Sequence, residues 1–250
     1  MINYFLSENL KTKNTFIKRL IYIAPIFVFL LSVFLTAAYY IVDGYNWWYM
    51  AIIPIFLVIE CTLFISIDDK YKNGAILSLP LDLRKIWIAK IFVILKNLII
   101  SNLVVFLFAN ILPLVIPMNS ILKIPFLNGL LAISVLIVTF MWQIPIWLYL
   151  GQKFGMFICI ILSLALNTLF QILSIEKFWF AVPFSYPARL MCPILKILPN
   201  GLMAVPESFT FKPELLSVSS VFYGVTVSIL LFIIFTLATA KQFSKIQSVK

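Results

Sequence analysis

The segment "IDDKYKNGAILSLPLDLRKIWIAK", residues 67–90, places eight charged side chains between two long apolar runs. So much charge is unusual here, because the 250-residue chain is 63% hydrophobic and only 11% charged, with a mean hydropathy of +1.10. Soluble domains average roughly 25% charged residues, and a soluble fold of this length could not bury so much apolar surface. The composition therefore predicts an all-α integral membrane protein, because a backbone in lipid must satisfy its own hydrogen bonds, as helices do.

Apolar runs occupy most of the remaining chain. A helix needs roughly 20 residues to cross the hydrocarbon core of a bilayer. Six runs reach this length, and we predict membrane spans at residues 20–42, 48–67, 87–112, 127–150, 154–175 and 215–240. No internal repeat and no linker to a second unit is evident, so residues 1–250 are expected to form a single transmembrane domain.

The distribution of Lys and Arg predicts the orientation of these spans. With the N-terminus in the cytoplasm, the segments 1–19, 68–90, 151–153 and 241–250 carry thirteen of these residues, and the opposite side carries five. Cytoplasmic loops of membrane proteins are enriched in Lys and Arg. Both termini are therefore expected in the cytoplasm, and the net charge of +10 reflects topology rather than binding to nucleic acid. On the outer side, a short loop at 43–47 would join the first two spans beside an aromatic belt.

The charged segment 67–90 would then lie on the cytoplasmic side, between spans two and three. Its apolar residues at 76, 79, 83 and 86 are spaced as on one face of a helix, but Pro80 interrupts this stripe. We therefore expect a short interfacial helix over residues 69–79, followed by a second helix that begins after Asp82 as its N-cap and continues into span three. Two interpretations stay open: a loop that only fixes topology, or a docking element for a cytoplasmic partner.

In the docking interpretation, the exposed face of the segment carries charges of both signs, supported by apolar residues and the proline. This coupling set comprises Asp68, Asp69, Lys70, Lys72, Ile76, Leu79, Pro80, Arg84 and Lys85.

Two ionisable residues fall inside predicted spans. Glu60 lies within span two, where a charge is costly and is expected to face a partner or a water-filled cavity. A role in gating or in contact with a cationic peptide, and a purely structural role in polar packing, both remain open. For Lys96 in span three, we expect the ammonium to extend to the cytoplasmic interface.

The loop at 176–214 contains six prolines, yet residues 178–198 are mostly apolar and aromatic. We expect this loop to lie on, or dip into, the outer leaflet as a gate or cap, although a static lid over the span ends is the alternative. Arg189 could anchor it at lipid phosphates, and Asn200 and Gly201 are typical of a turn. The candidate cap residues are Trp179, Pro183, Tyr186, Pro187, Arg189, Pro193, Pro199, Asn200 and Gly201.

Catalytic and metal-binding patterns are missing from the sequence. It has no histidine, and its cysteines (Cys61, Cys159 and Cys192) are too scattered for a metal cluster, so no metal site is expected. No pair of carboxylates occurs within a span, which disfavours a membrane-embedded protease or lipid phosphatase. The phosphate-binding pattern G-x-x-x-x-G-K-[ST] is also absent, because "GQKFG" at 151–155 has the wrong spacing. We therefore expect no enzyme activity and no bound cofactor.

Three stretches resemble a known family. "GAILSLPLDLRKIWIAK" (74–90) resembles the segment after the second span in permeases of type-2 ABC exporters, and "SENLKTKNTFIKRLIYIAP" (7–25) is similar to their N-terminal amphipathic elbow helix. "FWFAVPFSYPARLMCPILKILPNGL" (178–202) is similar to a loop of lantibiotic-immunity ABC permeases.

This resemblance implies a permease subunit in a bacterial cell membrane that expels a lantibiotic and so protects its producer. The implied partners are ABC ATPase subunits, which use ATP and Mg, a second homologous permease or a second copy of this chain, the lantibiotic peptide and membrane lipid. The segment at 68–90 would be the coupling helix that receives the ATPase. Export of another membrane-active antibiotic or lipid-like substrate, or a non-transporting role in sensing or assembly, remains an alternative.

Overall fold

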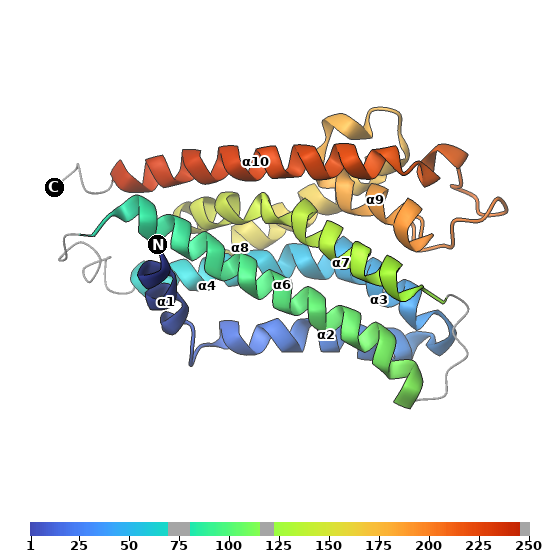
Figure 1. The fold of residues 1–250 in the computed structure, drawn as a ribbon, viewed down its shortest axis with the longest axis horizontal. Helices are drawn as coiled ribbons and strands as arrows, with labels where there is room; N and C mark the ends of the chain where they lie inside the picture. Colours follow the sequence, from blue (N-terminus) through green and yellow to red (C-terminus); the bar gives the residue numbers. More distant parts are fainter. Residues whose placement is uncertain (70–80, 116–122, 246–250) are drawn as a thin grey trace.

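The computed structural model describes residues 1–69, 81–115 and 123–245, and Figure 1 shows their arrangement. Within these residues the secondary structure is helical, apart from one isolated bridge between Ile197 and Met203. The longer elements are α1 (Ile2–Lys11), α2 (Phe16–Leu35), α3 (Tyr40–Trp47), α4 (Ile53–Asp69), α6 (Leu83–Val115), α7 (Phe126–Met141), α8 (Gln143–Ile172), α9 (Tyr186–Leu195) and α10 (Ser219–Ser244). The shorter ones are η1 (Ala37–Tyr39), the π-helical turn η2 (Trp48–Ile52), η3 (Leu173–Ile175), η4 (Trp179–Ala181), η5 (Pro183–Ser185) and η6 (Pro213–Leu216).

Among the described residues, five helical segments are long and apolar enough to cross a membrane. These segments are Phe16–Leu35, Ala37–Asp68, Leu83–Leu114, Gln143–Ile175 and Ser219–Ser244, and α7 is a shorter apolar helix. Large apolar side chains cover the outside of the bundle; Phe157 is 75% exposed and Phe222 is 74% exposed. An apolar surface of this kind is compatible with contact with lipid, as the composition predicts.

The connection between the first two apolar helices differs from the prediction. Residues 43–47, predicted as an outer loop, are helical, and the chain instead leaves the helix at Thr36, directly after α2. Thr36 donates a hydrogen bond from Oγ1 to Asp43 Oδ2 (2.7 Å), which ties the turn to α3. Gly44 permits close packing against α2, because a Cβ there would lie 2.7 Å from Phe29 Cε1. The turn was missed because this close approach depends on tertiary packing.

Helix α8 contains a reversal of the chain. Gly155 has φ 76° and ψ 176°, a conformation essentially restricted to glycine. Residues 24 positions apart in one unbroken helix would be separated by roughly 36 Å, yet Gln143 and Asn167 share a hydrogen bond of 3.1 Å. The parts of α8 before and after Gly155 are therefore antiparallel neighbours.

Helix α4 lies in the interior, where it packs mainly against α8 and also against α2 and α6. The two ends of the bundle differ (Figure 1). At one end α1 packs on the first turns of α6, and Trp87 stacks on Phe243 of α10 (ring centroids 4.6 Å apart), so α1 and the last turns of α10 lie there. At the other end, the chain before α9 (η3 to η5) and the chain after it (as far as η6) lie around this short helix, all of whose residues are buried.

The reversal at Gly155 supplies a direct test of this fold. No atom lies within 4 Å of a Cβ built on Gly155, so Gly155→Ala would introduce backbone strain without a clash. We expect it to cost about 1–3 kcal/mol of stability, seen as a lower melting midpoint of the purified protein in detergent. Met156→Ala, at the exposed neighbouring position, is the control and should leave the midpoint nearly unchanged. Equal midpoints for the two variants would contradict the reversal.

Candidate functional site

Four charged residues meet at the end of the bundle where α1 and the last turns of α10 lie. Lys90 of α6 donates hydrogen bonds to Glu8 Oε2 of α1 (2.8 Å) and to Asp68 Oδ2 of α4. Lys11 of α1 donates to the other oxygen of each carboxylate, at 2.7 Å from Glu8 Oε1 and 2.9 Å from Asp68 Oδ1. We call these four residues the charge cluster; it joins α1, α4 and α6 with two positive and two negative charges.

The charge cluster is largely removed from solvent. Lys90 is 1% exposed, Glu8 3% and Asp68 9%. The Lys90 ammonium also lies 4.8 Å from the centroid of the Phe64 ring, a favourable cation–π contact. Burial alone would lower the pKa of Lys11, but Glu8 and Asp68 outweigh that effect and raise this pKa above its ordinary value. Removal of one partner from a buried ion pair is costly in stability, because the remaining charge stays buried without a partner.

The structure changes the interpretation of the predicted coupling set. Asp68 was expected on the exposed face for docking, but it is buried in the charge cluster, because two lysines converge on it. Asp69 is the last residue of α4, and Arg84 and Lys85 are exposed in the first turn of α6. The other members of the set, Lys70, Lys72, Ile76, Leu79 and Pro80, lie outside the described residues.

The predicted N-cap of the third span is confirmed. Asp82 lies directly before α6, and its Oδ1 accepts hydrogen bonds from the backbone N–H groups of Arg84 (3.0 Å) and Lys85 (3.3 Å) in the first turn of that helix. A slight burial would raise the pKa of Asp82, but these donors and the Lys85 ammonium lower it. The cap satisfies N–H groups that a helix start otherwise leaves free.

Glu60 and Lys96, the two ionisable residues predicted inside spans, each make a hydrogen bond to a neighbouring helix. Glu60 of α4 is fully buried, and its Oε1 accepts a hydrogen bond from Asn97 Nδ2. Lys96 extends back toward α1, where its ammonium donates to Asn9 Oδ1. Glu60 therefore makes an interhelical polar contact, and Lys96 reaches toward the end of the bundle where α1 lies.

Further buried polar pairs cross between helices. Trp48 Nε1 donates to Asn102 Oδ1 (3.1 Å) between η2 and α6. Within the α8 hairpin, Gln143 pairs with Asn167, and Ser163 donates to the carbonyl oxygen of Pro54 on α4 (3.1 Å).

At the opposite end, the predicted cap residues come together in one packed unit. Trp179 stacks edge-on against Tyr186 (5.8 Å between ring centroids), and the Tyr186 hydroxyl donates to the Phe180 carbonyl (2.6 Å). Pro183 begins η5, and Pro187 and Pro193 lie within α9. A tight turn follows after Pro199, where Asn200 Oδ1 accepts from Leu202 N (3.1 Å) and Gly201 has φ 80°.

Arg189 has a different place from the one predicted. It is 6% exposed and does not reach outward to lipid phosphates. Its guanidinium instead donates to the carbonyl oxygens of Ser174 (3.3 Å) and Glu214 (2.8 Å) and lies 5.2 Å from the Trp179 ring centroid. The planar fork of an arginine suits this bridging of two backbone segments, so Arg189 holds the start and the end of the cap together.

No pattern in the sequence marks Glu8, Lys11 and Lys90 as members of a site. Glu8 and Lys11 are three residues apart in α1, a spacing typical of a local surface ion pair. Their convergence with Asp68 and Lys90, 57 and 82 positions away in sequence, leaves no periodic signal.

Removal of one cation should show how far the fold depends on the charge cluster. We expect Lys90→Met to lower stability by about 3–5 kcal/mol, because Asp68 and Glu8 then share only Lys11, and to lower the melting midpoint in detergent. The double variant Lys90→Met with Asp68→Asn should recover part of this loss, because one cation then faces one carboxylate. Lys85→Met, at an exposed ion pair with Asp82, is the control. A loss no larger than that of Lys85→Met, or no recovery in the double variant, would contradict the structural role of the cluster.

Comparisons with known proteins do not identify the chain. No protein-family model, no curated protein and no solved structure matches it. Its function must therefore be argued from the residues and the geometry described above.

Proposed function

We propose that this chain is the permease subunit of an ABC exporter that expels a lantibiotic, or another membrane-active compound, from the bacterial cell membrane. ATP hydrolysis would be carried out by separate ATPase subunits, and a second permease, homologous or identical, would complete the pathway. The observation that carries this proposal is the charge cluster. It joins the elbow helix α1 to the end of α4 and the start of α6, on both sides of residues 70–80.

This arrangement suits a coupling device for a physical reason. A partner that docks at residues 70–80 would push on the ends of α4 and α6, and those ends are cross-linked by Lys90 and Asp68. Arg84 and Lys85 remain exposed beside this junction and are available to an acidic surface of a partner. The cap around α9, at the far end of the bundle, would then cover the exit on the outer side.

The proposal includes six membrane crossings with both termini in the cytoplasm. The sixth arises because α7 and the first part of α8 would form one crossing, and the part of α8 after Gly155 would return as the next. Both termini then lie at one end of the bundle, opposite the cap.

This topology can be tested by cysteine labelling, because the native cysteines Cys61, Cys159 and Cys192 are all buried. We expect Phe209→Cys, at a position that is 97% exposed in the cap, to react with a membrane-impermeant maleimide in intact cells. Lys13→Cys, exposed after α1, should react only after the cells are permeabilised. The reverse pattern would overturn the orientation, and labelling of both in intact cells would contradict a membrane between them.

The transport function is tested by protection. A lantibiotic-producing strain from which this gene is deleted should become sensitive to its own lantibiotic, and the wild-type gene should restore growth. We expect Arg84→Ala with Lys85→Ala to abolish most of this protection and co-purification of the ATPase, with the chain still present in the membrane. Lys153→Ala with Lys241→Ala removes the same charge at the same end of the bundle and is the control, expected to protect fully.

Two results would overturn the proposal. One is unchanged lantibiotic sensitivity after deletion, with no other membrane-active antibiotic affected. The other is full protection by the chain in a strain without any partner ATPase.

A further inference from the structure

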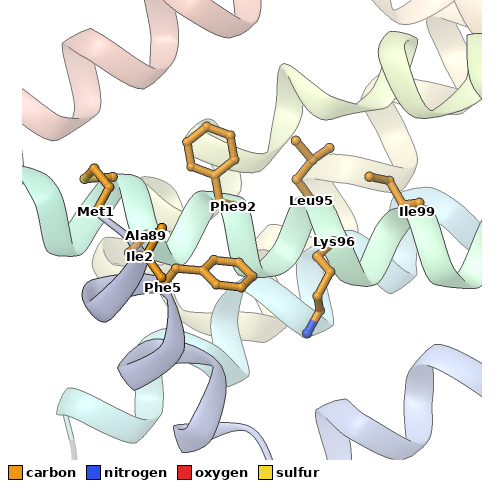
Figure 2. A pocket seen from close by; sticks show the side chains of 8 residues that line it. All are labelled: Met1, Ile2, Phe5, Ala89, Phe92, Leu95, Lys96 and Ile99. Carbon is orange, nitrogen blue, oxygen red and sulfur yellow. The ribbon is translucent and has the colours of Figure 1, made fainter.

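A groove lies where the elbow helix α1 crosses α6 (Figure 2). It has a volume of about 440 Å³ and is lined by Met1, Ile2, Phe5, Ala89, Phe92, Leu95, Lys96 and Ile99. Seven of these residues are apolar, and several remain open to the surroundings; Ile2 is 76% exposed and Phe92 44%. Figure 2 shows Phe92 and Leu95 on one side of α6, with the Lys96 side chain extending from the other side past the ring of Phe5.

The charge of this groove is positive. Lys96 is its only charged lining side chain, and the ammonium makes one hydrogen bond to a described residue, to Asn9 Oδ1. An ammonium carries three N–H donors, so two are left for a ligand. Lys18, which is exposed at the start of α2, is close enough to repel the Lys96 charge. Glu60 attracts that charge from inside the bundle, but its Oε1 already accepts the hydrogen bond of Asn97.

We infer that this groove binds an anionic phospholipid. The phosphate of the head group would accept hydrogen bonds from Lys96, with Lys18 supplying a second positive charge, and an acyl chain would lie along Phe5, Phe92 and Ile99. Basic pockets on the cytoplasmic face of membrane proteins bind anionic head groups in this way. A cationic peptide is disfavoured because both lysines would repel it, and a neutral lipid would leave their charges without a counter-ion. This site is independent of the proposed transport function and would exist in a sensing or assembly protein too.

The site can be tested by native mass spectrometry of the full chain, purified in detergent and offered an equal mixture of dioleoyl phosphatidylglycerol and dioleoyl phosphatidylcholine. We expect wild-type protein to retain phosphatidylglycerol preferentially. Lys96→Gln should lower this preference about five-fold, the effect of one lysine at a lipid surface, and Lys96→Arg should keep it. Lys153→Gln is the matched control: it removes one positive charge at the same end of the bundle, where Lys153 lies on the Tyr149 ring instead.

The control separates a specific site from general attraction, because the chain carries a net charge of +10. Equal losses for Lys96→Gln and Lys153→Gln would overturn the site, as would equal retention of the two lipids by wild type. The Lys96→Gln protein must elute as wild type on size exclusion; if it does not, the comparison of Lys96→Arg with Lys153→Gln decides. If Lys96→Arg retains phosphatidylglycerol with the wild-type preference, the site is supported. If Lys96→Arg loses this preference while Lys153→Gln keeps it, the role of positive charge at the site is overturned.

Discussion

The pairing of Lys90 near the start of α6 constrains the whole end of the bundle. An ammonium that is 1% exposed must be neutralised, and the two carboxylates that do so come from different helices, Glu8 of α1 and Asp68 of α4. Helix α1 is therefore an integral part of the bundle, because Glu8 must enter the bundle to complete the pairing. The same pairing closes the chain across residues 70–80, since Asp68 precedes that segment and Lys90 follows it.

The interior of the bundle obeys a similar requirement without full charges. Lipid offers no hydrogen bonds, so polar side chains inside the helices must find partners on neighbouring helices or on their own backbone. Gln143 finds Asn167 only because Gly155 reverses the chain between them, and Ser163 then reaches the Pro54 carbonyl oxygen on α4. A single backbone conformation that suits glycine thus determines which polar residues of α8 face each other and which face α4.

Local signals in the sequence were sufficient for the class of fold and for some of its boundaries. The apolar runs predicted the long helices, and Asp82 predicted the start of α6, because hydrophobicity and capping act over a few residues. The turn at Thr36 and the positions of Asp68 and Arg189 could not be predicted in this way. Each depends on a partner far away in sequence: Phe29 against Gly44, Lys90 for Asp68, and the Ser174 and Glu214 carbonyls for Arg189. Asp68 lies in a polar stretch and Arg189 in an apolar one, and in both cases the burial follows from partners that only the fold brings together.

These contacts also limit how α4 and α6 could move. Three side-chain links join α6 to α4 and to η2, which continues into α4: Lys90 to Asp68, Asn97 to Glu60, and Asn102 to Trp48. The residue number rises along α6 as it falls along α4 and η2, so the helices are antiparallel, and the links run from the first turns of α6 to just past its middle. A tilt of one against the other would break several buried polar contacts at once, each of which is costly in a medium without water. A force applied at residues 70–80 would therefore displace α4 and α6 as one body. Helix α10 is the least buried of the long apolar helices in the described part of the chain, but its last turns would follow this body, because Trp87 Nε1 of α6 donates a buried hydrogen bond to Thr239 Oγ1 (2.9 Å).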